Sequence, residues 1–253
     1  MGSFRLSIAI KFLFVFGILM LGSAASAQMT LPSLNLGFKT TNNPDEVVNA
    51  IKIIMILTVL TLAPAILIMM TSFTRIVIVL SFLRQAMGTQ SAPPNQVLVG
   101  LSLFLTFFVM GPFFSQINTN SLQPYLAGKM GQERALDEAL APLRKFMFHQ
   151  TRPDDLSLFI NMSKIERPKN RADVPTTVLI PSFIISELKT AFQVGFIIFL
   201  PFLVIDMVVA GVLMSMGMMM LPPVIVSLPF KIMLFVLVDG WTLLIGSMVN
   251  SFG

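Results

Sequence analysis

The sequence predicts an all-α polytopic membrane protein, built from helical hairpins kinked by prolines, with a small helical periplasmic domain. Of its 253 residues 55% are hydrophobic and only 11% are charged, and the mean hydropathy is +0.84. Soluble domains carry charge on about a quarter of their residues. The chain also contains uncharged tracts of the length that one helix needs to cross a bilayer, about 20 residues. These tracts predict membrane helices.

Several classes of function find no support in the residues. The chain has no cysteine, which excludes disulfides, thiol nucleophiles and thiolate metal sites. It has one histidine, His149, and no GxSxG, HExxH or glycine-rich phosphate motif. We therefore expect no enzyme, cofactor or metal site. The net charge is +5, but the basic residues are scattered, so a nucleic-acid partner is not expected.

Residues 1–27 have the pattern of a signal peptide. Arg5 and Lys11 precede the apolar run Phe12–Leu21, and small residues at 25–27 follow it. The apolar run is shorter than a membrane span, which favours a cleaved signal over an uncleaved first helix. Residues 28–49 are polar and are predicted to form an exported leader.

Residues 50–117 are predicted to form the first membrane hairpin. Residues 53–74 are uncharged and contain Pro64, so we expect a kinked span. A short connection with Arg75, Arg84 and no acid follows, which places it in the cytoplasm by the positive-inside rule. Residues 97–116 run back outward, and Pro112 is expected to interrupt this span near its end.

Residues 118–186 are the one stretch of soluble character, and we expect a small helical domain on the side of the leader. Residues 133–150 show helical periodicity, and Pro153 begins a second predicted helix. Pro181 is predicted to open a third helix, which then enters the membrane. The apolar positions of the first helix are Leu136, Leu140, Leu143 and Met147.

Residues 187–253 are predicted to form a second membrane hairpin, with spans at 192–213 and 224–249. The two predicted hairpins give four spans. Adjacent prolines at 222 and 223 force a bend between the last two spans. The bend carries five methionines in seven residues, which suit either an irregular core or a surface that seals against a partner. These are Met214, Met216, Met218, Met219 and Met220.

Five ionised residues lie in or beside apolar tracts, where a central charge costs at least about 2.5 kcal/mol. They must face protein or water. They could line an ion or polypeptide pathway, or they could pair with one another, across subunit contacts among others, or snorkel to the membrane interface. The residues are Arg75, Arg84, Asp206, Lys231 and Asp239.

Long strings in two regions resemble the FliP family of type III secretion export-gate proteins, flagellar and virulence-associated. The first region contains TSFTRIVIVLSFLRQAMGTQ at 71–90, PPNQVLVG at 93–100 and FLTFF at 104–108. The second contains SELKTAF at 186–192, PFLVID at 201–206, LPP at 221–223, LPFK at 228–231 and VDGW at 238–241. The leader and residues 118–173 match only loosely.

The resemblance implies a subunit of the flagellar protein export gate in the bacterial inner membrane, at the basal body. Several copies, a pentamer by resemblance, are expected to assemble with FliQ and FliR and with other export-apparatus proteins. Unfolded protein substrates would pass through the pore. Met218, Met219 and Met220 match the methionine gasket of the family, with Met214 and Met216 beside them, and Glu187 lies in a motif near subunit contacts. The N-terminus and residues 118–186 would be periplasmic.

Two alternatives remain open from the residues. One is a small proton- or ion-coupled secondary transporter, in which Asp206 and Asp239 bind the coupling ion. The other is a purely structural nucleus on which other subunits assemble.

Overall fold

The computed structural model describes residues 68–89, 91–165, 168–218 and 220–253, with residues 51, 53–54, 57–58, 60–62 and 64–65. The predicted signal peptide, the leader and much of the first predicted span lie outside these described residues. The chain divides into two compact units, residues 1–53 and 54–253. All the elements below belong to the second.

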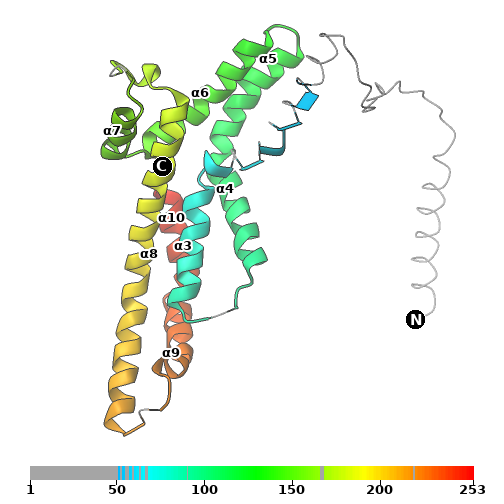
Figure 1. Ribbon diagram of the computed structural model, residues 1–253. Coiled ribbons are helices and arrows are strands. Elements are labelled where there is room, and N and C mark those ends of the chain that lie inside the picture. Colours follow the sequence, from blue (N-terminus) through cyan, green and yellow to red (C-terminus); the bar gives the residue numbers. More distant parts are fainter. Residues whose placement is uncertain are drawn as a thin grey trace, which may run out of the picture. The chain divides into compact units, whose positions relative to one another are not determined.

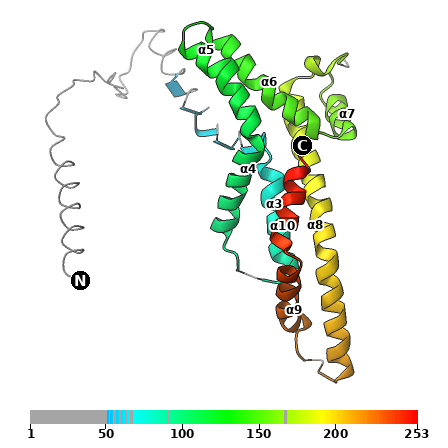
Figure 2. The same ribbon diagram turned by 180° about the vertical axis from the view of Figure 1, so that it is seen from behind.

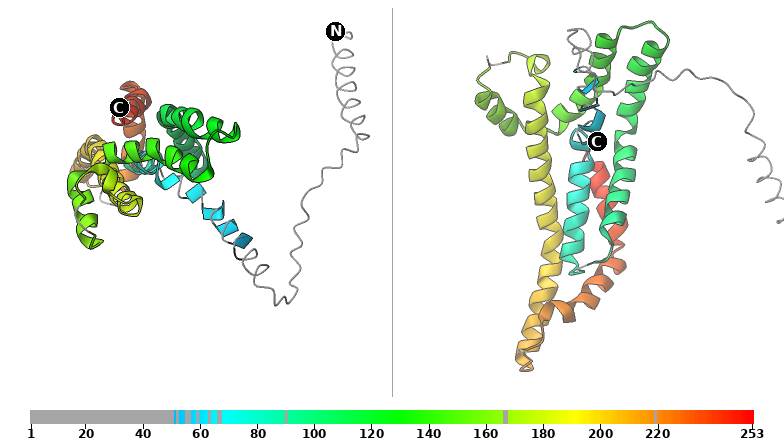
Figure 3. Two further views of the ribbon diagram at one scale, coloured as in Figure 1. Left: turned by 90° about the horizontal axis from the view of Figure 1, so that it is seen from above. Right: turned by 45° about the vertical axis from the view of Figure 1, so that its right-hand side comes forward.

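The regular elements that the structure describes are helices, which confirms the predicted all-α class. The long helix α8 is the common neighbour: α3 runs beside it, α9 packs against it, and α6 and α7 contact it. Figures 1, 2 and 3 agree in placing α3 alongside α8. The helices are α3 (Phe73–Ala86), α4 (Asn95–Ile117), α5 (Gln123–Leu126), α6 (Gln132–Gln150), α7 (Pro153–Met162), α8 (Thr176–Ser215), α9 (Pro223–Leu237) and α10 (Gly240–Asn250).

The predicted cytoplasmic connection is largely a helix, α3. Its apolar residues recur at three- and four-residue steps, so one face can pack against α8 although the segment is rich in β-branched residues of modest helix propensity. The buried face is Ile76, Val79, Leu80 and Leu83. The helix ends at Gly88, whose φ of +76° suits a residue without a Cβ. The loop itself is therefore residues 87–94, and Arg75 is not a loop charge.

Pro112 was predicted to interrupt the span at 97–116, and this prediction is wrong. Helix α4 continues through this proline, and a π-helical turn (Asn118–Leu122) joins it to α5. Proline removes one backbone donor, and long apolar helices of the membrane type tolerate this because the freed carbonyl can be satisfied locally or by a neighbouring group. The geometry changes later, at the π-helical turn, where the Ser121 hydroxyl donates to the Ala135 carbonyl of α6.

The predicted helices of the soluble block are present. Helix α6 covers the predicted range, and α7 begins at Pro153, whose missing N–H costs nothing at a first helical position. The buried face of α6 is Ala135, Leu143, Phe146 and Met147, whereas Leu136 is exposed. The predicted start of the third helix at Pro181 is wrong, because α8 begins five residues earlier, at Thr176.

Helix α8 runs unbroken for 40 residues and contains both Pro181 and Pro201. Among the described residues, α8 and the 32-residue stretch Asn95–Leu126 are each long and apolar enough to cross a membrane. Helices α9 and α10 pass the same test only together, and they are bent by 64°. The predicted span at 224–249 is therefore covered by two helices and is broken rather than straight. The break lies at Asp239, which has a left-handed backbone with φ of 50°.

Phenylalanines join the helices at the main core. Phe146 of α6 contacts Phe113 of α4, Phe183 of α8 and Phe252 after α10, with ring centroids 5.2, 5.8 and 6.2 Å away. A smaller cluster forms around Phe202 and Phe235. Apolar side chains thus tie the soluble block to the apolar helices.

Replacing Gly195 with alanine should destabilise the α3–α8 contact. A Cβ at this position would lie 2.5 Å from a ring carbon of Phe82. Overpacking of this kind typically costs about 1–3 kcal/mol. Thermal unfolding of the purified protein would measure it.

Gly211→Ala is the matched control on the same helix, because a Cβ there meets nothing within 4 Å. Its expected effect is a gain of up to about 1 kcal/mol from helix propensity. Equal effects of the two substitutions would contradict the tight contact.

Candidate functional site

The methionine-rich segment forms the turn between α8 and α9. Gly217, with φ of +74°, closes α8, and the Met218 N–H donates back to the Leu213 carbonyl at 2.9 Å. Pro222 and Pro223 then begin α9 rather than ending α8, since proline is favourable at a first helical position. The predicted bend is present, but glycine ends the incoming helix.

The methionines of this turn face outward. Met220 is 99% exposed, and Met214, Met216 and Met218 are exposed as well. Met219 lies outside the described residues. Nothing else in the described chain covers these apolar side chains, so they are available to another surface.

A buried ion pair holds α3 to α8 in the middle of the unit. The Arg75 guanidinium donates to both carboxylate oxygens of Glu187, with Nε to Oε2 at 2.9 Å, and both residues are almost fully buried. Gln150 Oε1 accepts from Nη2 at 2.8 Å, and the Ser251 hydroxyl accepts from Nη1 at 3.0 Å. The guanidinium also lies 4.1 Å over the Phe252 ring. These five residues are named the ion-pair centre.

A second ion pair, buried at its lysine, joins α8 to α9 near the methionine turn. Lys231 Nζ donates to Asp206 Oδ2 at 2.6 Å and to the Ala86 carbonyl at 3.2 Å. The Ser227 hydroxyl donates to the other oxygen of Asp206. Lys231 therefore places a positive charge at the C-terminus of α3, where the helix dipole favours it. The pair fixes the hairpin formed by α8 and α9 against α3.

The two remaining predicted charges lie apart from these pairs. Arg84, half-buried, donates to Asn95 Oδ1 at 2.6 Å and to the Pro93 carbonyl at 3.3 Å. It closes the loop between α3 and α4. Asp239 is exposed at the break between α9 and α10. It lies two residues past the end of α9, whereas Lys231 lies inside that helix.

A polar cluster clamps α7 to α8. Asp155 is 1% exposed and accepts from Lys189 Nζ and from the Ser186 hydroxyl, the latter at 2.8 Å. The Arg152 N–H donates to the Ser186 oxygen at 3.0 Å. Burial alone raises the pKa of Asp155, but the hydrogen bonds from Lys189 and Ser186, with the nearby positive charges, bring this pKa below the usual value of 3.8.

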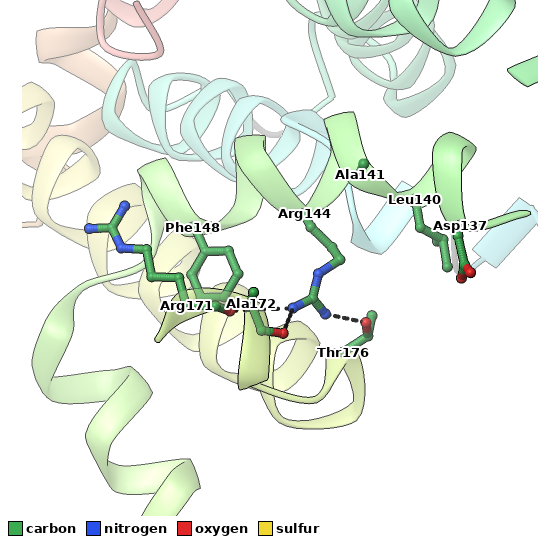
Figure 4. Close-up of a pocket in the computed structure, with 8 residues that line it drawn as sticks. All are labelled: Asp137, Leu140, Ala141, Arg144, Phe148, Arg171, Ala172 and Thr176. Carbon is green, nitrogen blue, oxygen red and sulfur yellow. Dashed lines mark hydrogen bonds between the residues drawn. The ribbon is translucent and has the colours of Figure 1, made fainter. Parts of the chain in front are cut away.

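An open cavity of about 500 Å³ lies between α6 and the start of α8 (Figure 4). Arg144 reaches across it and donates to the Thr176 hydroxyl and to the Val174 carbonyl, the latter at 2.7 Å. Weaker contacts join it to the carbonyls of Arg171 and Ala172. The guanidinium is thus occupied in fastening the loop before α8 to α6.

The structure brings four of the predicted site residues into pairs and leaves the four described methionines, Met214, Met216, Met218 and Met220, exposed. Arg75 pairs with Glu187, and Lys231 with Asp206. Their neutral partners carried no signal of their own in the sequence. A buried guanidinium has five donors and one carboxylate cannot satisfy them, so further acceptors were required. The Asp155 cluster was not predicted, because the sequence from Pro153 indicated only the start of a helix.

Removing one member of the ion-pair centre should destabilise the fold more than removing both charges. Arg75→Met or Glu187→Leu alone leaves a buried unpaired charge, at a cost of about 3–5 kcal/mol. The double substitution Arg75→Met with Glu187→Leu should regain much of this loss. Thermal unfolding in detergent is the measurement, and Arg84→Met is the control, with a cost of about 1 kcal/mol or less.

If the double variant is no more stable than either single variant, the uncompensated charge is not the cause of the destabilisation.

The clamp at Asp155 should lose its contribution in acid. The folded pKa lies below 3.8, so the stabilisation is complete above that value and disappears as the pH falls through the folded pKa. Hydrogen exchange of α7 amides, followed from neutral pH to about pH 2 and corrected for intrinsic rates, measures this. Asp155→Asn should abolish the additional acid opening, whereas exposed Asp154→Asn should not. An identical acid response in all three proteins would contradict the clamp.

Comparison with known proteins identifies the family of this chain. A sequence model described as the FliP family matches residues 56–248, a range that includes the methionine turn and both buried ion pairs. The loosely matching leader lies outside this range.

Curated relatives share close similarity over most of their length. The chain is 57% identical to the flagellar biosynthetic protein FliP of Bacillus subtilis over 213 residues, which cover 84% of this chain and 96% of the relative. It is 55% identical to FliP of Pectobacterium carotovorum over 203 residues, 80% of this chain and 79% of the relative. It is 50% identical to FliP of Caulobacter vibrioides over 227 residues, 90% and 85% respectively. The chain therefore belongs to the FliP family.

Proposed function

We propose that this protein is a subunit of the flagellar type III protein export gate, in which several copies surround a protein-conducting pore. The family membership supports a role in flagellar biosynthesis, since the relatives are named flagellar biosynthetic proteins. The exposed methionine turn is the observation that supports the proposal of a pore.

The turn has the properties of a deformable seal. Its described methionines lie at the end of a hairpin, exposed and without a charged neighbour from Val212 to Phe230. When equivalent turns from several copies meet around one axis, they form an apolar constriction that resists hydrated ions. Thioethers are flexible, so the constriction can adapt to a passing polypeptide and close again.

The apolar faces of the helices support an oligomer in a membrane. Only 11% of the most apolar window of α8 and 22% of that of Asn95–Leu126 are buried within the chain. Phe104, Phe107 and Phe108 on α4 and Met207 and Val208 on α8 are exposed. Lipid or neighbouring protein must cover these surfaces. The two buried ion pairs hold the hairpin rigid while its outer faces remain free for such contacts.

The partners and location follow from the family resemblance. The proposal is a homo-oligomer, a pentamer, assembled with FliQ and FliR in the bacterial inner membrane at the flagellar basal body. Residues 118–186 and the N-terminus are periplasmic in this arrangement. Arg75 is paired inside the protein, so Arg84, in the last turn of α3, is the arginine that supports the cytoplasmic placement of this segment. The chain acts as a passive conduit and not as an enzyme, and other components drive the transport.

The ion-coupled transporter is the weaker candidate. It needs Asp206 and Asp239 at one ion site. Both oxygens of Asp206 already accept hydrogen bonds, from Lys231 and Ser227, and Asp239 lies beyond them along the α9 axis. The pairing leaves no free carboxylate pair for a coupling ion.

Replacing Met218, Met219 and Met220 with alanine should leave assembly intact and raise the ion leak. Alanine removes the thioether that fills the constriction, so water and ions can enter. Ion conductance of cells or vesicles that contain the assembled complex is the measurement, with the yield of the complex measured in parallel.

The control is the double variant Met207→Ala with Met233→Ala. These methionines are 66% and 56% exposed, on α8 and α9, outside the turn. They should leave conductance unchanged. Unaltered conductance in the turn variant, with assembly normal, would count against the seal.

A further inference from the structure

Helix α10 is a separate rigid segment with a defined break at one end. At this break the backbone of Asp239 is left-handed, and α10 turns by 64° away from α9. Gly240 fits tightly there, because a Cβ would lie 2.3 Å from the Phe235 ring. A change of a few backbone angles at these two residues can swing a whole helix.

Helix α10 and the residues after it contact the main core through a single stripe of apolar side chains. Leu244, Met248 and Phe252 recur every four residues and pack against the main core, whereas Trp241, Leu243 and the other outward-facing positions are exposed. Phe252 is the largest of the three. The stripe therefore has its strongest apolar contact at the end farthest from the break.

The polar contacts of this segment are concentrated at the same end. Arg75 donates to the Ser251 hydroxyl at 3.0 Å and to the Ser251 carbonyl at 3.4 Å. Gln150 donates to the Phe252 carbonyl at 3.1 Å. Phe252 also lies beneath the Arg75 guanidinium and stacks on Phe146. Helix α3 thus holds both Ser251 and Phe252, and helix α6 holds Phe252.

We infer that α10 is a hinged strap, with its hinge at Asp239 and Gly240 and its fastening at Ser251 and Phe252, which can release while α3, α6 and α8 stay folded. Release exposes Phe252 and frees only one side of the Arg75 guanidinium, because Glu187 still holds the other. The fastening of the strap is therefore the part of the ion-pair centre that can open by itself. This property belongs to the single chain and does not depend on the proposed pore.

Hydrogen exchange of the purified full chain in detergent tests the strap. Phe252→Ala should lower the protection of α10 amides by about tenfold or more, because the protection of a locally opening segment follows its opening free energy. Protection in α3, α6 and α8 should stay within experimental error. Ser251→Ala should give the same pattern with a smaller loss, and it serves as the test if Phe252→Ala does not fold.

Two matched controls and an optical reporter sharpen the result. Ser247→Ala lies one turn earlier on α10, and Phe230→Ala removes an exposed ring of α9; both should leave α10 protection unchanged. The single tryptophan, Trp241, lies beside the hinge with its ring 5.4 Å from Phe235, so its emission should shift with strap release. A uniform loss of protection across α3, α6, α8 and α10, or no loss in α10, overturns the strap.

Discussion

The ion pair between Arg75 and Glu187 is the constraint around which the described unit is arranged. A guanidinium removed from water must have acceptors in several directions, and here they come from α6, α8 and the residues after α10. No single helix can supply them. Helices α3, α6 and α8 and the residues after α10 therefore meet at this charge, and Phe252 of the main apolar core lies over the guanidinium.

The other polar contacts repeat this arrangement at different heights of α8. Arg144 fastens the loop that precedes α8. The Ser186 hydroxyl, in the first half of α8, donates to Asp155 of α7. Farther along α8, Asp206 pairs with Lys231 of α9. Each contact joins α8, or the loop before it, to one neighbouring segment, whereas much of the apolar surface between the contacts remains exposed. The chain thus fixes its helices to one another by charge and leaves its hydrophobic faces for lipid or other subunits.

The helical class, the soluble block and the methionine turn could be predicted from the sequence, because hydropathy and periodicity are local properties. The predictions that are wrong rest on a single residue type, taken without the residues around it. Pro112 and Pro181 were expected to bound helices, yet both lie inside one, since a single lost hydrogen bond does not end a long apolar helix. Asp239 was expected inside a span, and it breaks the span instead. The pairing of Arg75 with Glu187 joins residues 112 positions apart, and no local pattern specifies such a contact.

The uninterrupted course of α8 has a mechanical consequence. From Glu187 to Ser215 the helix measures about 42 Å, so it acts as a lever arm. A tilt of about 5° at the buried carboxylate would displace the far end by about 4 Å over this length, roughly the width of a methionine side chain. Small rearrangements at one end of this protein are therefore amplified at the other, without any change inside the helix.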